Sequence, residues 1–173
     1  MGSVIRGKIW RLGDGISTDG IVPGRYYHLR GDLKALSEHA LEDADARFAK
    51  EATPGTILVA GRNFGQGSSR EHAALVLRER GVKVILAQSF ARIFFRNAVN
   101  VGLVPIVCDL TELQTGDEIE VSLAEGVVRA PARGIERSFE PLPPVMRAIF
   151  ADGGLVPHIL KRGGFRWDST ESY

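Results

Sequence analysis

Between residues 56 and 107 the chain alternates short apolar runs with segments of helical periodicity, and this alternation constrains its fold more than any other feature. The apolar runs have the length and composition of buried parallel strands. Each intervening segment places apolar residues at helical spacing and ends at a glycine, Gly81 or Gly102. This β-α-β-α-β order predicts a parallel sheet with right-handed crossovers. The strands are expected at 56–60, 82–87 and 103–107, and the helices at 68–80 and 89–101.

The rest of the chain predicts further elements around this centre. Asp32 is placed to cap a short helix. The connections are too short to separate a second domain. Strands are expected at 4–12, 118–123 and 127–130, the last two as a hairpin, and short helices at 145–150 and 155–161.

Composition excludes several classes of function. The 173 residues carry 22 Lys and Arg against 21 Asp and Glu, and a net charge of +1 lacks the basic excess of a nucleic-acid binder. A single cysteine, Cys108, allows neither an intrachain disulfide nor a cysteine-ligated cluster within this chain. We expect it to be a buried apolar residue. No apolar run approaches the ~20 residues of a membrane span, and no signal peptide is evident, so a cytoplasmic protein is expected.

The strongest local signal is the segment Gly65–Ala73, which reads GQGSSREHA. Its glycines allow a ligand to approach the backbone closely. Two serines and Arg70 follow at the expected helix start, where free N–H groups favour an anion. A guanidinium there can grip a carboxylate with two hydrogen bonds. The alternative is a capping box made by Ser68 and Glu71, which leaves the glycines and Arg70 unexplained.

The class of anion follows from what this segment lacks. It has no Lys in the position that a Walker A loop requires. Arg70 occupies the place of the third glycine of a dinucleotide-binding loop. A nucleophile elbow is also absent. Small carboxylates are therefore favoured over nucleotides.

Three motifs carry a resemblance to the swivelling domain of the aconitase superfamily. Gly67–Ala73 resembles the family's GSSREHA signature. Ser17–Tyr26 is similar to its D-T-D-x-I-I-P-x-x-Y stretch, and Ser89–Asn97 to its S-F-x-R-I-x-x-x-N run. Over residues 8–165 the chain resembles the separate small subunits of 3-isopropylmalate dehydratase and homoaconitase.

The resemblance implies a fold, a reaction and a partner. The fold is one α/β swivelling domain at residues 1–165, in three layers (sheet, sheet, helices) with a mixed, mainly parallel sheet, before a polar tail at 166–173. The reaction is that of a hydro-lyase, most closely 3-isopropylmalate dehydratase of leucine biosynthesis, which interconverts 2- and 3-isopropylmalate by dehydration and rehydration. The resemblance places the 4Fe–4S cluster on a large subunit. This chain is then expected to bind no cofactor or metal itself and to be active only with that subunit.

The same resemblance assigns roles to five residues. Ser68 matches the family's catalytic base, and Asp19 matches a site acid. Ser69 and Arg70 match residues that bind substrate carboxylates, and Arg30 resembles a substrate-contacting arginine. Structural alternatives exist for Ser68 as a cap, Asp19 as a turn former and Arg30 as a solvated loop residue.

Three functions stay open. The first is the small subunit of 3-isopropylmalate dehydratase. The second is a homoaconitase or another substituted-malate dehydratase, which Arg30 favours because it can pair with a third carboxylate. The third is a stand-alone anion-binding module without catalysis. The chain departs from the family's pattern at Ser17 and Gln66, where many members have Asp and Cys. Self-association of the isolated chain is expected, whereas nucleic-acid and membrane partners are not.

Overall fold

The computed structural model describes residues 4–164 of the chain. Seven strands form one mixed sheet in the order β4-β3-β2-β1-β5-β6-β7. The polar tail expected at 166–173 lies outside the described residues, as does residue 165. The strands are β1 Val4–Arg11, β2 Ile57–Ala60, β3 Val84–Ala87, β4 Val104–Val107, β5 Glu118–Ser122, β6 Val127–Ala130 and β7 Ile135–Ser138.

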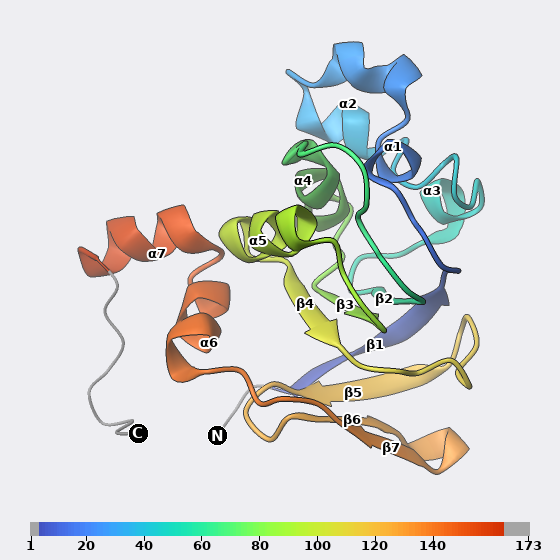
Figure 1. Cartoon of the computed structure of the whole chain (residues 1–173), viewed down its shortest axis with the longest axis vertical. Coiled ribbons are helices and arrows are strands. Elements are labelled where there is room, and N and C mark those ends of the chain that lie inside the picture. Colours follow the sequence, from blue (N-terminus) through green and yellow to red (C-terminus); the bar gives the residue numbers. More distant parts are fainter. Residues whose placement is uncertain (1–3, 165–173) are drawn as a thin grey trace.

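Helices follow most of these strands and gather on one side of the sheet and at its end (Figure 1). The α-helices are α1 Thr18–Ile21, α2 Leu33–Ser37, α3 Phe48–Glu51, α4 His72–Glu79, α5 Arg92–Val101, α6 Pro144–Ala151 and α7 Leu155–Arg162. Two 3₁₀ helices are η1 Gly24–Leu29 and η2 Pro131–Arg133.

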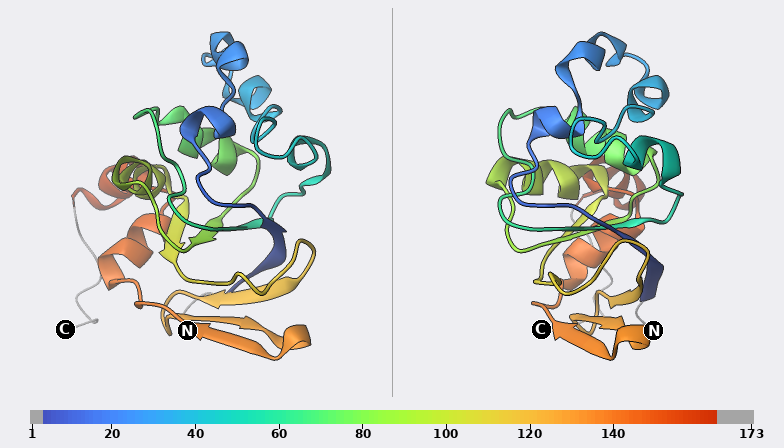
Figure 2. Two further views of the ribbon diagram at one scale, coloured as in Figure 1. Left: turned by 45° about the vertical axis from the view of Figure 1, so that its right-hand side comes forward. Right: turned by 90° about the vertical axis from the view of Figure 1, so that its right-hand side faces the viewer.

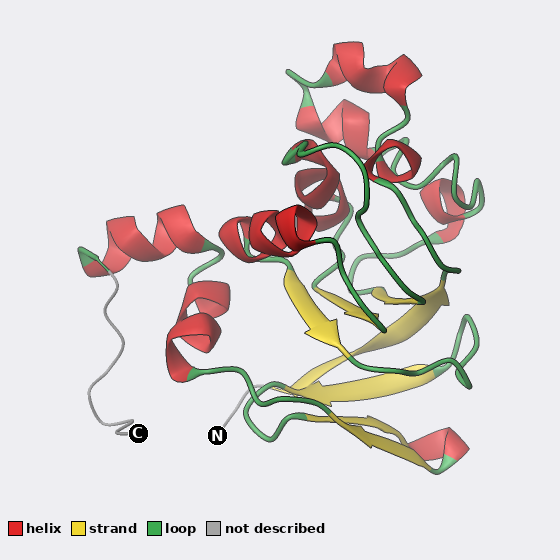
Figure 3. Ribbon diagram, viewed as in Figure 1, coloured by secondary structure: helices red, strands yellow, loops and turns green. Residues whose placement is uncertain are grey.

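Strand β1 joins the two halves of the sheet. Its residues Ile9–Arg11 pair in parallel with β2, and its residues Val4–Lys8 pair antiparallel with β5. The strands β2, β3 and β4 continue the parallel half, while β5, β6 and β7 continue the antiparallel half. Figure 3 shows the antiparallel half below the parallel half, with the helices α1 to α5 above it. The predicted α/β fold with three layers is confirmed.

Two apolar cores lie between these three layers, and β2 contributes to both. Leu58 and Ala60 belong to the core under the helices, whereas Ile57 and Val59 belong to the core between the two halves of the sheet. Alternate residues of a strand point to opposite faces, so a strand that is buried on both faces must be apolar throughout. This is why the continuous apolar run predicted the strand correctly.

The central helices show one confirmed end and three corrections. Gly102 ends α5 in the left-handed conformation at φ +80°, as predicted. The helix expected to open at Ser68 begins instead at His72. The helix expected from residue 89 begins instead at Arg92, and the Ser89 hydroxyl accepts the N–H of Asn63 rather than capping the helix. Ile93, an apolar residue at helical spacing in this segment, is not buried but 50% exposed.

The loops that follow β1 and β2 run side by side at the carboxyl ends of the parallel strands (Figures 1 and 2). The N–H of Thr18 donates to the carbonyl of Gln66 at 2.7 Å, and the N–H of Gly65 donates to that of Ile16 at 2.7 Å. Ligands of open α/β sheets bind at this edge. The sheet topology therefore brings two of the predicted motifs together.

Candidate functional site

Ser68 is held by Thr18, the first residue of α1. The backbone N–H of Ser68 donates to Thr18 Oγ1 at 3.0 Å, and the two hydroxyl oxygens lie 3.0 Å apart. Thr18 is 1% exposed, while Ser68 is half-buried. A buried hydroxyl with two hydrogen-bond partners has a fixed position. Ser68 is thus oriented by a side chain from a segment 50 residues earlier.

This arrangement excludes the capping box, which was the alternative interpretation of the motif. The helix α4 starts at His72, and its N-cap residue, Glu71, makes no side-chain hydrogen bond to the backbone. Ser68 precedes the helix by four residues and bonds Thr18 instead. The motif therefore has a reason other than helix capping.

Two glycines of the motif allow close packing of the protein itself. A Cβ atom at Gly65 would collide with the ring of Phe94, and Gly65 has φ +80°. A Cβ atom at Gly67, which has φ +105°, would lie 3.1 Å from Thr18 Oγ1. The sequence predicted that these glycines make room for a ligand. The structure shows that Gly65 makes room for the side chain of Phe94, and Gly67 for that of Thr18.

Arg70 and Asp19 form an ion pair close to Ser68. Arg70 Nη1 donates to Asp19 Oδ1 at 2.8 Å, and the side chains are 32% and 65% exposed. Asp19 is the second residue of α1, whose N-cap Ser17 accepts the N–H of Gly20 at 2.9 Å. The cap and the ion pair together fix α1 against the loop that carries Ser68.

Ser69 is exposed, and its carbonyl accepts a hydrogen bond from Asn97 Nδ2 at 3.3 Å. This contact joins α5 to the loop. Arg92 and Arg96 of the same helix are exposed and make no hydrogen bond or ion pair with the loop within residues 4–164.

Arg30 follows Tyr27 in the chain, and its side chain turns back to contact Tyr27. It caps η1 at its carboxyl end, and its Nη1 donates to the carbonyl of Tyr27 at 3.4 Å. Its guanidinium carbon is 5.3 Å from the centre of the Tyr27 ring, and that of Arg70 is 4.7 Å from it. All five residues predicted from the sequence therefore fall in one region of the structure.

Four consecutive backbone amides in this region, those of residues 69–72, are open, which means that their N–H groups have no hydrogen-bond acceptor within the described part of the chain. They precede or begin α4, where the helix dipole favours negative charge. Together with the guanidinium of Arg70, these amides can bind an anion.

The sequence assigned no role to Thr18 or Tyr27. Thr18 was within a quoted motif, but its burial and its bond to Ser68 depend on α1, whose four residues read as part of a loop. No sequence pattern singles out Tyr27, because a tyrosine whose ring contacts two arginines need not lie at any fixed distance from them along the chain.

Metal donors are sparse. Among residues 4–164 no group of three or more His, Cys, Asp or Glu side chains is arranged to hold a metal ion. Cys108 is 6% exposed, as predicted, and lies in the core between the two halves of the sheet. Burial, followed by the charge of Asp109, raises the pKa of its thiol to about 11. A thiol at neutral pH is a poor metal ligand.

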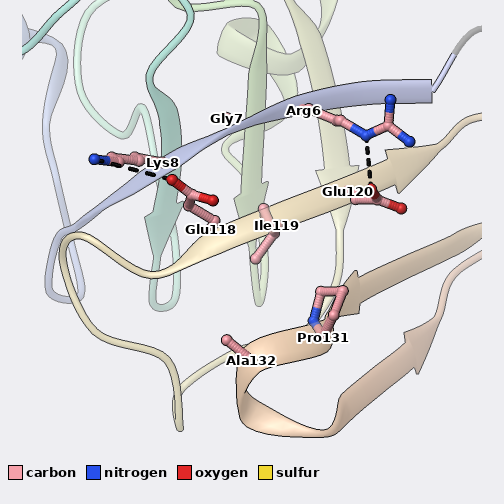
Figure 4. Close-up of a pocket in the computed structure, with 8 residues that line it drawn as sticks. All are labelled: Arg6, Gly7, Lys8, Glu118, Ile119, Glu120, Pro131 and Ala132. Atoms are coloured by element: carbon pink, nitrogen blue, oxygen red, sulfur yellow. Dashed lines mark hydrogen bonds and ion pairs between the residues drawn. The ribbon is translucent and has the colours of Figure 1, made fainter.

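A pocket of about 450 Å³ lies between β1, β5 and η2 (Figure 4). Its charged residues already pair with one another: Arg6 with Glu120 at 2.6 Å, and Lys8 with Glu118 at 3.9 Å. It contains none of the site residues. It is a surface hollow between paired side chains and offers no unpaired charge to a ligand.

Comparison with known proteins identifies the family. The model of the aconitase C-terminal domain matches residues 18–110. The chain is 51% identical over 160 residues to 3-isopropylmalate dehydratase small subunit 2 of Archaeoglobus fulgidus, covering 92% of this chain and 97% of that protein. It is 46% identical over 161 residues to a methanogen homoaconitase small subunit of Methanothermobacter thermautotrophicus, covering 93% and 94%.

The fold agrees with these similarities. A crystal structure of 3-isopropylmalate dehydratase from Methanocaldococcus jannaschii superposes with a TM-score of 0.87 at 38% identity, covering 93% of this chain and 96% of that one. No helix among residues 4–164 is long and apolar enough to cross a bilayer. The family match includes every predicted site residue, and the relatives match nearly end to end. The chain belongs to the family of aconitase C-terminal domains.

Proposed function

We propose that this chain is the small subunit of a heteromeric hydro-lyase that acts on 3-isopropylmalate or a closely related compound. The proposal places the enzyme in the cytoplasm and its reaction in leucine biosynthesis. The observation that carries the proposal is the convergence of Ser68, Thr18, Arg70 and Asp19 at one edge of the sheet. The relatives support it, because dehydratase small subunits match the chain over almost its whole length.

Ser68 acts as the base in this proposal. It removes the proton from the carbon next to the hydroxyl-bearing carbon, so that water can leave. A serine hydroxyl is a weak base in water, and its alkoxide requires nearby hydrogen-bond donors. The hydroxyl of Thr18 is such a donor, 3.0 Å from Ser68 Oγ, and the amides of residues 69–72 and the guanidinium of Arg70 are further donors in the same region.

The remaining residues bind and orient the substrate. Arg70 and Ser69 bind a carboxylate, and Arg30 approaches a second one from η1. Asp19 is the second catalytic residue of the proposal, an acidic side chain of the site that holds Arg70 as a carboxylate through the 2.8 Å ion pair. Two arginines and one aspartate leave an excess of positive charge, which suits a di- or tricarboxylate substrate.

The donor set of this chain does not fit an iron–sulfur cluster, because its only cysteine is buried and protonated. We therefore assign the 4Fe–4S cluster to a large partner subunit. Lewis-acid activation of the substrate hydroxyl would come from that partner. The chain contributes the base and the carboxylate-binding groups, which form half of the active site.

Reconstitution with the large subunit tests this proposal. The two chains, purified anaerobically, should interconvert 2- and 3-isopropylmalate, while the isolated small subunit should be colourless and inactive. Homoaconitate and citrate are assayed in parallel. Turnover by the small subunit alone would contradict the proposal that it forms only half of the site. No turnover of any of these substrates by the pair would also contradict the proposal and would leave an anion-binding module. Sizing the isolated chain tests its proposed self-association.

A homoaconitase is the second candidate, favoured by Arg30. An alkyl branch offers nothing to a guanidinium, whereas homoaconitate carries a third carboxylate. If this second candidate is right, Arg30→Val should lower kcat/KM at least about tenfold for a tricarboxylate and should preserve turnover of an alkylmalate. Equal losses on both substrates would mean that Arg30 binds a carboxylate that all of them share.

A further inference from the structure

Tyr27 contacts both arginines of the candidate site. The guanidinium carbon of Arg70 lies 4.7 Å from the centre of its ring, and that of Arg30 lies 5.3 Å from it. The ring of His72 approaches Tyr27 edge-on, with centres 5.6 Å apart and planes at 80°. Segments 40 residues apart in the chain thus meet on one aromatic ring.

An aromatic ring that contacts both guanidiniums offsets their mutual repulsion. Without such a ring, two neighbouring guanidiniums repel each other, and neither keeps a fixed position when no substrate is bound. The face of an aromatic ring attracts a cation within about 6 Å of its centre, so one ring can hold both. Each arginine then needs only one further contact: Asp19 for Arg70, at 2.8 Å, and the Tyr27 carbonyl for Arg30, at 3.4 Å.

We propose that Tyr27 is a positioning residue that presents Arg70 and Arg30 as a preformed pair to two carboxylates of the substrate. The inference rests on the proposed function, because it requires a substrate with at least two carboxylates. Arginine loses much side-chain freedom when it binds an anion. Holding both guanidiniums in advance reduces that loss and tightens binding.

The ring carries this role, and the hydroxyl does not. Tyr27 Oη has no hydrogen-bond partner among residues 4–164. The side chain is half-buried and packs against the core under the helices. Phenylalanine therefore preserves the surface on which the arginines stack, and leucine removes that surface while retaining an apolar contact with the core.

The neighbouring Tyr26 is a matched control. It lies on the same 3₁₀ helix and stacks with its own arginine, Arg25, at 4.7 Å. Its ring also stacks on His39 at 3.6 Å, and its hydroxyl donates to Glu42 at 3.3 Å. Within residues 4–164 it makes no hydrogen bond, ring contact or cation–π contact with a candidate site residue, so Tyr26→Leu changes the same helix and leaves the contacts of the arginine pair in place.

Kinetics of the reconstituted enzyme provide the first test. Tyr27→Leu should raise KM by about tenfold, the effect of losing about 1.4 kcal/mol of substrate binding, and should leave kcat within about threefold of wild type. Tyr27→Phe and Tyr26→Leu should both keep KM near the wild-type value. An unchanged KM in Tyr27→Leu, or an equal defect in Tyr27→Phe, would overturn the inference.

Arginine NMR signals of the full-length small subunit provide a test that does not need activity. The Nε–H signals of Arg70 and Arg30, assigned with Arg70→Lys and Arg30→Lys, should lose their ring-current shift in Tyr27→Leu and keep it in Tyr27→Phe and Tyr26→Leu. Signals that do not move would overturn the inference even in an active enzyme. If the reconstituted enzyme turns over no substrate but the small subunit shows these shifts, the proposed function is contradicted and the role of Tyr27 in holding the two arginines still stands.

Discussion

Thr18 and Ser68 form a hydroxyl pair whose direction becomes fixed when Ser68 ionises. Thr18 Oγ1 accepts the backbone N–H of Ser68 at 3.0 Å, and either hydroxyl can donate to the other while both are neutral, whereas an alkoxide at Ser68 can only accept from Thr18. A hydrogen bond to an ionised oxygen is stronger than one to a neutral oxygen. Thr18 therefore stabilises the alkoxide of Ser68 more than the hydroxyl, which lowers the cost of forming the base.

The first residue-scale prediction concerns Ser68. Because it bonds Thr18 and does not cap α4, Ser68→Ala should lower kcat by about 10²- to 10⁴-fold and change the free energy of unfolding by less than ~1 kcal/mol. Kinetics of the reconstituted enzyme and urea unfolding measure the two effects. Ser69→Ala is the control and should mainly raise KM. Near-normal turnover by Ser68→Ala would rule out Ser68 as the base.

The second concerns Thr18. Thr18→Val keeps the shape of this buried side chain and removes both hydrogen bonds, so the unfolding free energy should fall by about 1–3 kcal/mol. The kcat should fall about 10- to 100-fold, since a charge-assisted bond is worth about 1.5–3 kcal/mol. Thr18→Ser should recover most of the activity. If Val and Ser variants show the same kcat, the hydroxyl has no role in catalysis.

At the scale of elements, apolar runs predicted the strands on both sides of β1 because those strands bury both faces or one complete face. The strand β7 was missed, since Ile135–Ser138 are mostly exposed and polar. The helix α1 was missed because Thr18–Ile21 has the composition of a turn and depends on the Ser17 cap. The motifs predicted five candidate site residues, but the contacts of these residues depend on the pairing of two loops, which the motifs do not encode.

A prediction at this scale concerns the end of α5. Gly102 has φ +80°, and a Cβ atom there would lie 2.6 Å from the carbonyl carbon of Gly153. Gly102→Ala should therefore lower the unfolding free energy by about 2–5 kcal/mol, the sum of backbone strain and overpacking. Gly116→Ala is the matched control: it has φ +96° with open space around it, and should cost only about 1–2 kcal/mol. Equal losses in urea unfolding would show that packing against Gly153 contributes nothing.

At the scale of the whole molecule, the connection between α6 and α7 contains a buried carboxylate. Asp152 has a side chain that is 1% exposed and accepts hydrogen bonds from Lys161 at 2.6 Å, Arg162 at 2.6 Å and His158 at 2.8 Å. His158 is fully buried. The hydrogen bonds from Lys161 and Arg162 hold the pKa of Asp152 well below its usual value. This cluster fixes α7 to the end of α6.

The pH dependence follows from that direction. A carboxyl group with a lowered pKa stabilises the fold above its unfolded pKa of about 3.9 and loses this contribution as the pH falls. Asp152→Asn should be less stable than wild type at pH 7, and the difference should shrink from about pH 5 downward. Urea unfolding at several pH values measures it. Other carboxylates with lowered pKa values, such as Asp45 and Asp117, are present in both proteins and cancel. Parallel curves would contradict the role of Asp152.

The candidate site residues all lie in one segment of the chain, and the segment that follows supports it by packing. Every candidate site residue lies between Thr18 and Asn97, while β5 to β7 and the helices α6 and α7 contain none. The family model ends at residue 110, shortly before β5 begins. We therefore expect relatives of this chain to tolerate replacements in β5 to β7 more readily than in the loops that hold Ser68 and Thr18, because these strands affect the candidate site only through packing, whereas the loops form it.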